Sequence, residues 1–184
     1  ENLDYMDAVR FLADRAGMKM PENSQMNDAA SRLRLRVLEA NREAARFFHT
    51  ILYAPEGRVG LEYYYGRGYT DHTIRRFGLG YAPDSYHALL DELRRKGFHD
   101  NELEAAFLTK RGPSNRPFDI FRNRVMIPII DIRGNVIAFG GRVLDDSKPK
   151  YLNSGDTLVF KKTNNLFALN FAKAMTDAPL ILCE

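Results

Sequence analysis

The chain has 184 residues, of which 45% are hydrophobic and 28% charged, and its formal net charge is +3. This composition is typical of a globular chain with one sizeable domain, or one domain with a helical appendage, and it argues against a disordered protein. No apolar run approaches the ~20 residues that a membrane-spanning helix needs, and no signal peptide opens the chain. We therefore expect a cytoplasmic protein with no membrane partner.

The cysteine and histidine content also bounds the chemistry. A single cysteine, Cys183, cannot form an internal disulfide, which fits a reducing cytoplasm. The four histidines show no ligand spacing with cysteine, so no zinc site is expected within this chain. The sequence starts without Met in the approach to a helix and stops at a strand-like run. We therefore expect a fragment of a longer polypeptide.

The first hundred residues are predicted to be mostly helical. Apolar spacing predicts a helix from Tyr5 to Ala16. A long helix, capped by Asn23 or Ser24 and reaching roughly Leu52, should follow with a nearly heptad stripe. That stripe runs through Met26, Ala30, Leu33, Val37, Ala40, Ala44, Phe47 and Ile51. A partner helix would explain it, although an amphipathic helix packed within its own domain is the commoner cause. Shorter helices are expected at 58–65, 70–77 (capped by Thr70), 86–96 and 101–107, with a turn at FGLGYAP.

The second half is predicted to contain the sheet. A basic loop (KRGPSNRP) precedes a hairpin in which Val125, Ile127 and Ile129 alternate and Gly134-Asn135 can supply positive-φ turn residues. A helix at about 167–175 and a buried strand at 180–183 should follow. The expected class is thus α+β, with a helical amino-terminal half followed by a small mixed or antiparallel sheet.

Positive charge is concentrated in the second half. Residues 110–162 hold 11 Lys/Arg against 5 Asp/Glu, whereas the rest of the chain holds 16 against 19. A solvated basic face would explain this, and so would an anionic partner. Cations along a groove neutralise phosphates, and interleaved aromatic residues stack unpaired bases. The candidate cations are Arg67, Arg122, Arg124, Arg142, Lys148, Lys150, Lys161 and Lys162, with Phe121, Tyr151 and Phe160 among them.

Several further residues have both a functional and a structural interpretation. Gly140-Gly141-Arg142 fits a phosphate cradle, but glycine pairs also mark bulges. Asn153, Ser154 and Thr157 fit local turn capping better than ligand binding. In the triplet Tyr63 to Tyr65, packing of one or two rings is favoured over base stacking. Glu184 ends a strand, where it could act in acid–base chemistry, hold a metal ion, or simply face solvent.

Several separated motifs together resemble the bacterial replicative DNA primases. They are YYYGRGYTDHTIRRFGLGYAP, FRNRVMIPIIDIRGNVIAFGGRVL, KPKYLNSGDTLVFKK, NNLFALNFA and the closing LILCE, and the similarity covers nearly the whole chain. The resemblance implies three regions. Residues 1–22 would follow an absent zinc-binding domain, 23–176 would form the amino-terminal subdomain of the RNA polymerase core, and 177–184 would begin a toprim subdomain.

The resemblance also implies residue roles. Arg67, Arg142, Lys150 and Lys162 fall on basic positions that guide single-stranded template or contact nucleotide phosphates in a basic groove. Tyr151 and Asn153 belong to the same motif, with Asn153 a candidate polar contact, and Glu184 falls on the toprim glutamate. Mg²⁺ or Mn²⁺ would serve the complete enzyme but is not expected on this fragment, because the toprim aspartates lie beyond the last residue. Zinc would belong only to the absent amino-terminal domain.

The expected function is therefore part of a DNA-dependent RNA polymerase that makes short primers for DNA replication. Its partners would be single-stranded template, ribonucleoside triphosphates, the RNA–DNA primer duplex and, through an absent carboxy-terminal domain, the replicative helicase. The fragment alone is expected to be inactive. Two alternatives remain open at this point: a non-catalytic single-strand-binding module of a phage or mobile element, and a protein-interaction scaffold built on the long helix.

Overall fold

The computed structural model of the protein describes residues 9, 11–13, 15–18, 24–173, 179 and 181. The chain forms two compact units, Glu1–Leu33 and Arg34–Glu184. In the first unit, residues 9, 11–13 and 15 are helical, as predicted, and helix α2 begins at Ser24. The predicted domain boundaries at 22/23 and 176/177 stay predictions.

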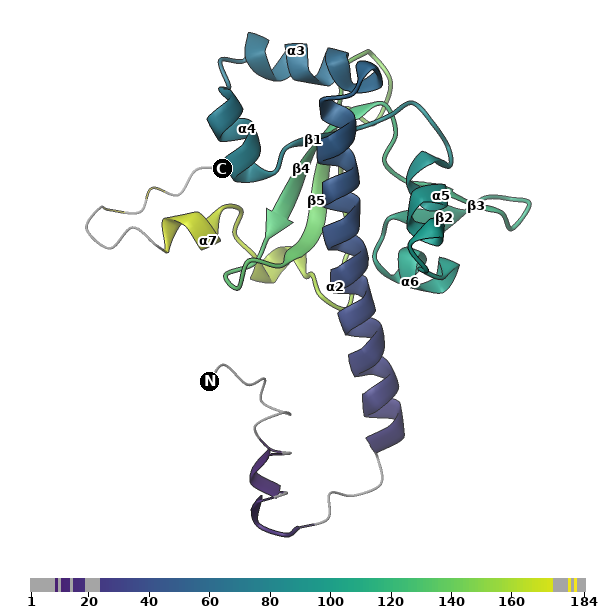
Figure 1. The fold of residues 1–184 in the computed structure, drawn as a ribbon, viewed down its shortest axis with the longest axis vertical. Coiled ribbons are helices and arrows are strands. Elements are labelled where there is room, and N and C mark those ends of the chain that lie inside the picture. The colour runs from purple at the N-terminus through teal and green to yellow at the C-terminus, as the bar shows by residue number, and fades with distance from the viewer. Residues whose placement is uncertain are drawn as a thin grey trace. The chain divides into compact units, whose positions relative to one another are not determined.

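The second unit mixes helices and short strands (Figure 1). Its helical elements are the rest of α2 (Ser24–Leu52), η1 (Pro55–Gly57), α3 (Arg58–Gly66), α4 (Asp71–Phe77), α5 (Ala88–Arg95), α6 (Asp100–Ala105), η2 (Lys162–Asn164) and α7 (Leu169–Ala172). Its strands are β1 (Gly80–Ala82), β2 (Thr109–Arg111), β3 (Pro117–Asp119), β4 (Arg124–Ile130), β5 (Val136–Val143) and β6 (Tyr151–Asn153). The predicted α+β class is what the structure shows.

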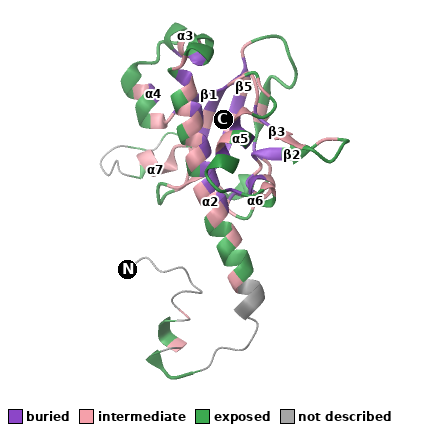
Figure 2. Cartoon of the chain, turned by 45° about the vertical axis from the view of Figure 1, so that its right-hand side comes forward, coloured by how far each residue is buried: buried purple, intermediate pink, exposed green. Residues whose placement is uncertain are grey.

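Helix α2 contains no glycine or proline and supplies much of the core. Its fully buried positions are Val37, Ala40, Asn41, Ala44, Phe48 and Leu52. Phe47 and Ile51 of the predicted stripe are half-buried, and Ile51 packs against the core cluster that contains Leu52. After Ala44 the fully buried positions advance in steps of four. From Val37 onward this stripe packs within its own domain, and buried residues gather where α2 crosses the sheet (Figure 2).

The main sheet is antiparallel, in the order β1-β4-β5-β6. One of its faces packs against α2, where the ring of Phe48 meets the ring of Phe139 with centroids 5.5 Å apart. Strand β1 corrects the sequence analysis, which read FGLGYAP as a turn only. Gly80 pairs with Met126, and a Cβ on Gly80 would lie 2.6 Å from the Cβ of Phe48, so only glycine lets this strand pass so close to α2.

The β4–β5 hairpin was predicted, and its turn is built by Asp131. One carboxylate oxygen of Asp131 accepts hydrogen bonds from the backbone N–H groups of Arg133 and Asn135, each at 2.9 Å. Gly134 has φ +86°, as expected, but Asn135 does not have positive φ. The strands therefore join through an Asx-type turn with one left-handed residue.

Helices α5 and α6 and the small β2–β3 sheet form a lobe beside α2. The basic segment predicted as a loop in fact supplies parts of both strands, and only its middle turns the chain. Arg36 of α2 fastens the lobe by donating to both carboxylate oxygens of Glu102, at 2.7 and 3.1 Å. This charged hydrogen bond holds the pKa of Glu102 below its usual value. Asp119 of β3 caps α5 by accepting from the N–H groups of Leu89 and Leu90.

The carboxy-terminal elements are described only in part. Helix α7 covers Leu169–Ala172 and begins two residues later than the predicted start at about 167, and its residue Phe171 packs on Phe77 of α4. The predicted strand at 180–183 falls outside the described residues, except for Ile181, which lies in no strand.

Candidate nucleic-acid interface

The face of β4, β5 and β6 that points away from α2, here called the open face, carries most of the predicted site residues. Successive residues of a strand point to opposite sides of a sheet. Because Arg142 pairs with Tyr151 and Gly140 pairs with Asn153, these four positions share one face. Val125 pairs with Arg142 and extends the same face onto β4.

Helix α3 closes one end of the open face. Tyr64 is 1% exposed, and its hydroxyl donates to the carbonyl oxygen of Met126 at 3.0 Å, which fixes α3 on the sheet. Its neighbour Tyr63 is half-buried, while Tyr65 is 46% exposed. The expected packing of one or two rings of this triplet is confirmed. The same packing turns Tyr63 and Arg67 toward β5 and β6.

Two arginines share the ring of Tyr63. The guanidinium carbon of Arg142 lies 4.9 Å from the ring centroid and that of Arg67 lies 5.6 Å away. Arg67 also donates from Nε to the Tyr63 hydroxyl at 3.2 Å, which raises the pKa of Arg67. Arg142 is further held 5.8 Å from the ring of Tyr151. These contacts keep two cations beside each other without a carboxylate between them.

These residues line a depression of about 350 Å³, the tyrosine pocket. Its wall includes Tyr63, Arg67, Tyr69, Arg142, Tyr151 and Asn153. Four residues predicted from the sequence (Arg67, Arg142, Tyr151 and Asn153) are therefore brought together from the residue that follows α3, from β5 and from β6. Tyr151 is 63% exposed, so much of its ring is free for a planar ligand.

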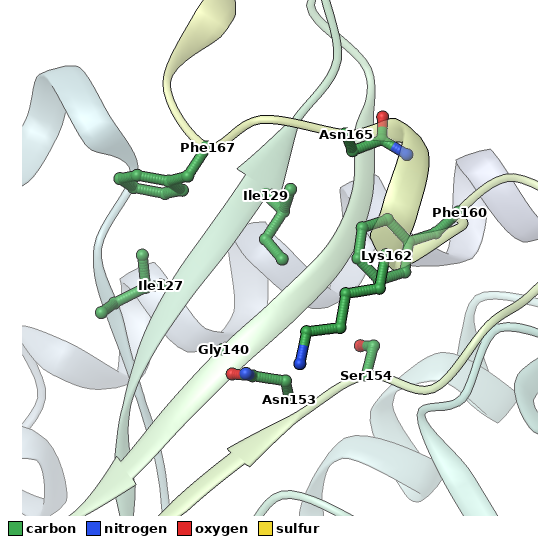
Figure 3. Close-up of a pocket in the computed structure, with 9 residues that line it drawn as sticks. All are labelled: Ile127, Ile129, Gly140, Asn153, Ser154, Phe160, Lys162, Asn165 and Phe167. Atoms are coloured by element: carbon green, nitrogen blue, oxygen red, sulfur yellow. The ribbon is translucent and has the colours of Figure 1, made fainter. Parts of the chain in front are cut away.

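A neighbouring depression of about 310 Å³, the lysine pocket, shares Ile127, Gly140 and Asn153 with the first. Lys162 extends over the open face toward Asn153 (Figure 3). Its backbone N–H donates to Asp156 at 3.1 Å, which helps to place η2 beside the sheet. Phe167 and Asn165 complete the wall, and nothing in the sequence had marked either as a site residue.

The turn after β6 is held by the side chains that the sequence analysis assigned to capping. The Ser154 hydroxyl accepts from the N–H of Phe139 at 3.0 Å, and the Thr157 hydroxyl accepts from the N–H of Phe160 at 3.1 Å. The interpretation as local turn capping is confirmed for Thr157, whereas Ser154 instead bonds to Phe139 of β5, fifteen residues earlier. Asn153 differs, because its side chain reaches both pockets.

The glycine pair of β5 has an explanation within the fold. A Cβ on Gly140 would lie 3.1 Å from Oδ1 of Asn153 on the open face. A Cβ on Gly141 would lie 2.6 Å from Cδ of Arg124 on the opposite face. Each glycine therefore admits a neighbouring polar side chain close to the backbone.

The structure divides the predicted basic set between the two faces. Arg122, Arg124 and Lys148 line a separate cavity and not the open face. Lys150 is exposed and lines none of these pockets, while its carbonyl oxygen accepts from the N–H of Val143 at 3.1 Å. Glu184 lies outside the described residues.

Within the described part of the chain, no group of three or more His, Cys, Asp or Glu side chains could hold a metal ion. Among the described helices, none is long and apolar enough to cross a membrane.

Comparison with known proteins gives one family. Residues 47–173 match the family described as the DNA primase catalytic core, N-terminal domain. DNA primases of Clostridium acetobutylicum and Deinococcus radiodurans are 42% and 44% identical, over 94% and 95% of this chain. The chain spans only 28% and 29% of their length.

Solved structures agree with this result. A DnaG primase catalytic domain bound to ssDNA matches with a TM-score of 0.74 and 34% identity, over 81% of this chain and 48% of that one. The RNA polymerase domain of Mycobacterium tuberculosis DnaG in complex with double-stranded DNA matches with a TM-score of 0.73 and 38% identity, over 77% and 45%. These matches favour the primase resemblance over a phage single-strand-binding module. The chain belongs to the family of the DNA primase catalytic core, N-terminal domain.

Proposed function

We propose that the open face guides single-stranded template and holds nucleotide phosphates during primer synthesis by a larger DNA-directed RNA polymerase. The observation that carries the proposal is the meeting of Arg67, Arg142, Tyr151 and Asn153 in one pocket that continues toward Lys162. A structural relative described as bound to ssDNA supports the same use of this fold. The nucleotidyltransfer itself, and with it the RNA–DNA primer duplex as product, belongs to the complete enzyme.

The chemistry of the pocket fits a flexible polyanion. Arg142 and Arg67 present planar donors that match phosphate oxygens, and the ring of Tyr63 contacts both guanidinium groups. The exposed ring of Tyr151 offers a stacking surface that accepts any base. Lys162 adds a point charge further along the strand face. Lys150 would contribute from the exposed approach to β6. This arrangement favours backbone contacts over sequence readout.

The rest of the assignment concerns the complete enzyme. Glu184 would be the first acidic residue of the toprim metal site, with Mg²⁺ or Mn²⁺ held together with residues outside this chain. Ribonucleoside triphosphates would enter beside it, and the replicative helicase would bind elsewhere, at a bacterial replication fork in the cytoplasm. We expect the 184-residue chain alone to make no primers. A primer-synthesis assay in which this chain yielded RNA would contradict that expectation.

The proposed binding of single-stranded template to the open face is tested by the salt dependence of that binding. A fluorescent single-stranded oligonucleotide is titrated by anisotropy at several salt concentrations with the unchanged chain, with Arg142→Gln and with Lys162→Gln. Each substitution should weaken binding and lower the slope of log K against log salt by about 1, because one phosphate contact is lost.

The matched control is Arg133→Gln, which removes the same charge at the exposed hairpin tip, outside all three pockets. If the control lowered the slope as much as Arg142→Gln does, the effect would be one of net charge. The assignment of the open face as the binding surface would then be wrong. Binding that did not depend on salt would reject it as well.

A further inference from the structure

A cavity of about 660 Å³, here called the arginine pocket, lies between α6, β2, the start of β4 and β6. Its charged lining consists of Glu104, Lys110, Arg111, Arg122, Arg124 and Lys148. It is separate from the open face. Leu152 lines it from β6, whereas its neighbours Tyr151 and Asn153 line the tyrosine pocket on the other side of the sheet.

Arg124 is the most unusual residue of this cavity. It is 7% exposed, its stem passes over Gly141, and its Nε donates to the carbonyl oxygen of Arg122 at 3.0 Å. Its Nη1 is buried and has no hydrogen-bond partner among the described residues. A buried guanidinium with an unpaired donor is costly unless an anion completes it. Burial and the neighbouring Arg122 lower the pKa of Arg124, and Asp145 only partly opposes them.

The other cations leave the cavity with excess positive charge. Only Arg111 is neutralised locally, since its Nε lies 2.8 Å from Oε1 of Glu104. Lys110 lies over the ring of Phe118 at 5.3 Å, and the structure shows no ion pair for it or for Lys148 within the described residues. Arg122 is held by the ring of Tyr86 at 4.3 Å. The field inside the cavity is therefore attractive to anions.

We propose that the arginine pocket binds the phosphate groups of a phosphorylated ligand, with Arg124 as the buried anchor and Lys110 and Lys148 as partners at the rim. Its volume lies in the range of small-molecule sites, which run from about 300 to 1,000 Å³. Phe107, Ile120 and Leu152 supply an apolar wall for an organic portion. A free polyphosphate or nucleotide and the backbone of a nucleic-acid strand share this chemistry. The inference does not depend on the function proposed for the open face.

The test follows amide NMR resonances of the chain during titration with inorganic tripolyphosphate, and separately with an unphosphorylated oligothymidylate. Saturable shifts are expected at Thr109, Lys110 and Arg111 of β2, which report on this cavity and not on the open face. In the variant Lys110→Gln/Lys148→Gln, the midpoint of these shifts should rise by about tenfold, since two charge-assisted contacts at a partly exposed rim are lost. Both side chains are exposed, so the fold should be kept.

The matched control is Arg75→Gln/Arg133→Gln, which removes two exposed charges outside this cavity. If tripolyphosphate causes saturable shifts at β2, and their midpoint rises in the test variant but not in the control, a free phosphorylated ligand is supported. If only the oligonucleotide gives such shifts, with the same difference between the test variant and the control, the ligand is the backbone of a nucleic-acid strand. No saturable shift at β2 with either probe, or equal weakening in the control, overturns the proposal.

Discussion

Replacing Gly141 of β5 by alanine should destabilise the protein, whereas the same change at the adjacent Gly140 should not. The new Cβ at 141 would lie 2.6 Å from Cδ of Arg124 and 3.2 Å from the sulfur of Met126. Carbon atoms prefer about 3.5–4.0 Å, so Arg124 would have to move by roughly 1 Å. The side chain of Arg124 can move little, because it is buried and its Nε is hydrogen-bonded to the carbonyl oxygen of Arg122.

The magnitude follows from two opposing terms. Overpacking a buried site costs about 1–3 kcal/mol, and replacing glycine by alanine returns about 0.4–1 kcal/mol by restricting the unfolded chain. We expect a net loss of about 1–2 kcal/mol for Gly141→Ala. At Gly140 the nearest atom is Oδ1 of the exposed Asn153, at 3.1 Å, which can rotate away. Gly140→Ala should therefore leave the free energy of unfolding unchanged or raise it by up to about 1 kcal/mol.

Urea unfolding followed by circular dichroism measures both variants. With m values of about 1–3 kcal/mol/M, the two midpoints should differ by about 1 M. In an Arg124→Ala background, the cost of Gly141→Ala should fall to less than half, because the nearest clashing atoms are gone and only the contact with the sulfur of Met126 at 3.2 Å remains. Equal midpoints for the two alanine variants, or an undiminished cost in that background, would refute the steric reasoning.

Two further predictions concern buried polar groups. Burial raises the pKa of Asp119 from 3.8 to about 6, so its ionised form opposes folding at neutral pH. Relative to Asp119→Asn, the unchanged protein should gain up to about 3 kcal/mol of stability as pH falls from 7 to 4, and parallel profiles for the two proteins in urea unfolding would contradict this. Tyr64→Phe should lower the free energy of unfolding by about 1–2 kcal/mol in the same assay, because it removes the buried hydroxyl that donates to the carbonyl oxygen of Met126. Tyr65→Phe, on the exposed side, should lower it by less than about 0.5 kcal/mol. Equal losses would argue against the role of the Tyr64 hydrogen bond.

Elements with strong local signals were predictable from the sequence. The β4–β5 hairpin alternates in β-branched residues, and Thr70 caps α4 through the N–H of Thr73 at 3.2 Å, as its position predicted. Strand β1 was not predictable, because three residues show no period and pair with β4 more than forty residues later. The β2–β3 pair was hidden because each strand has only three residues and lies in or beside a segment rich in helix and strand breakers.

The candidate site was predictable only where a motif carried it. Arg67, Arg142, Tyr151 and Asn153 meet as expected, because β5 and β6 pair in register beside α3. Local sequence patterns did not show which face of the sheet each cation occupies. Arg122, Arg124 and Lys148 stand close in sequence to open-face residues yet belong to another cavity.

The thinness of the sheet between these two cavities constrains how the chain can vary in length. Neighbouring positions of β6 serve different cavities, with Tyr151 and Asn153 on one side and Leu152 on the other. A one-residue insertion or deletion in this strand would exchange its side chains between the cavities, although every residue type were kept. Substitutions can therefore adjust either side independently, whereas a change in the number of residues within β6 affects both at once.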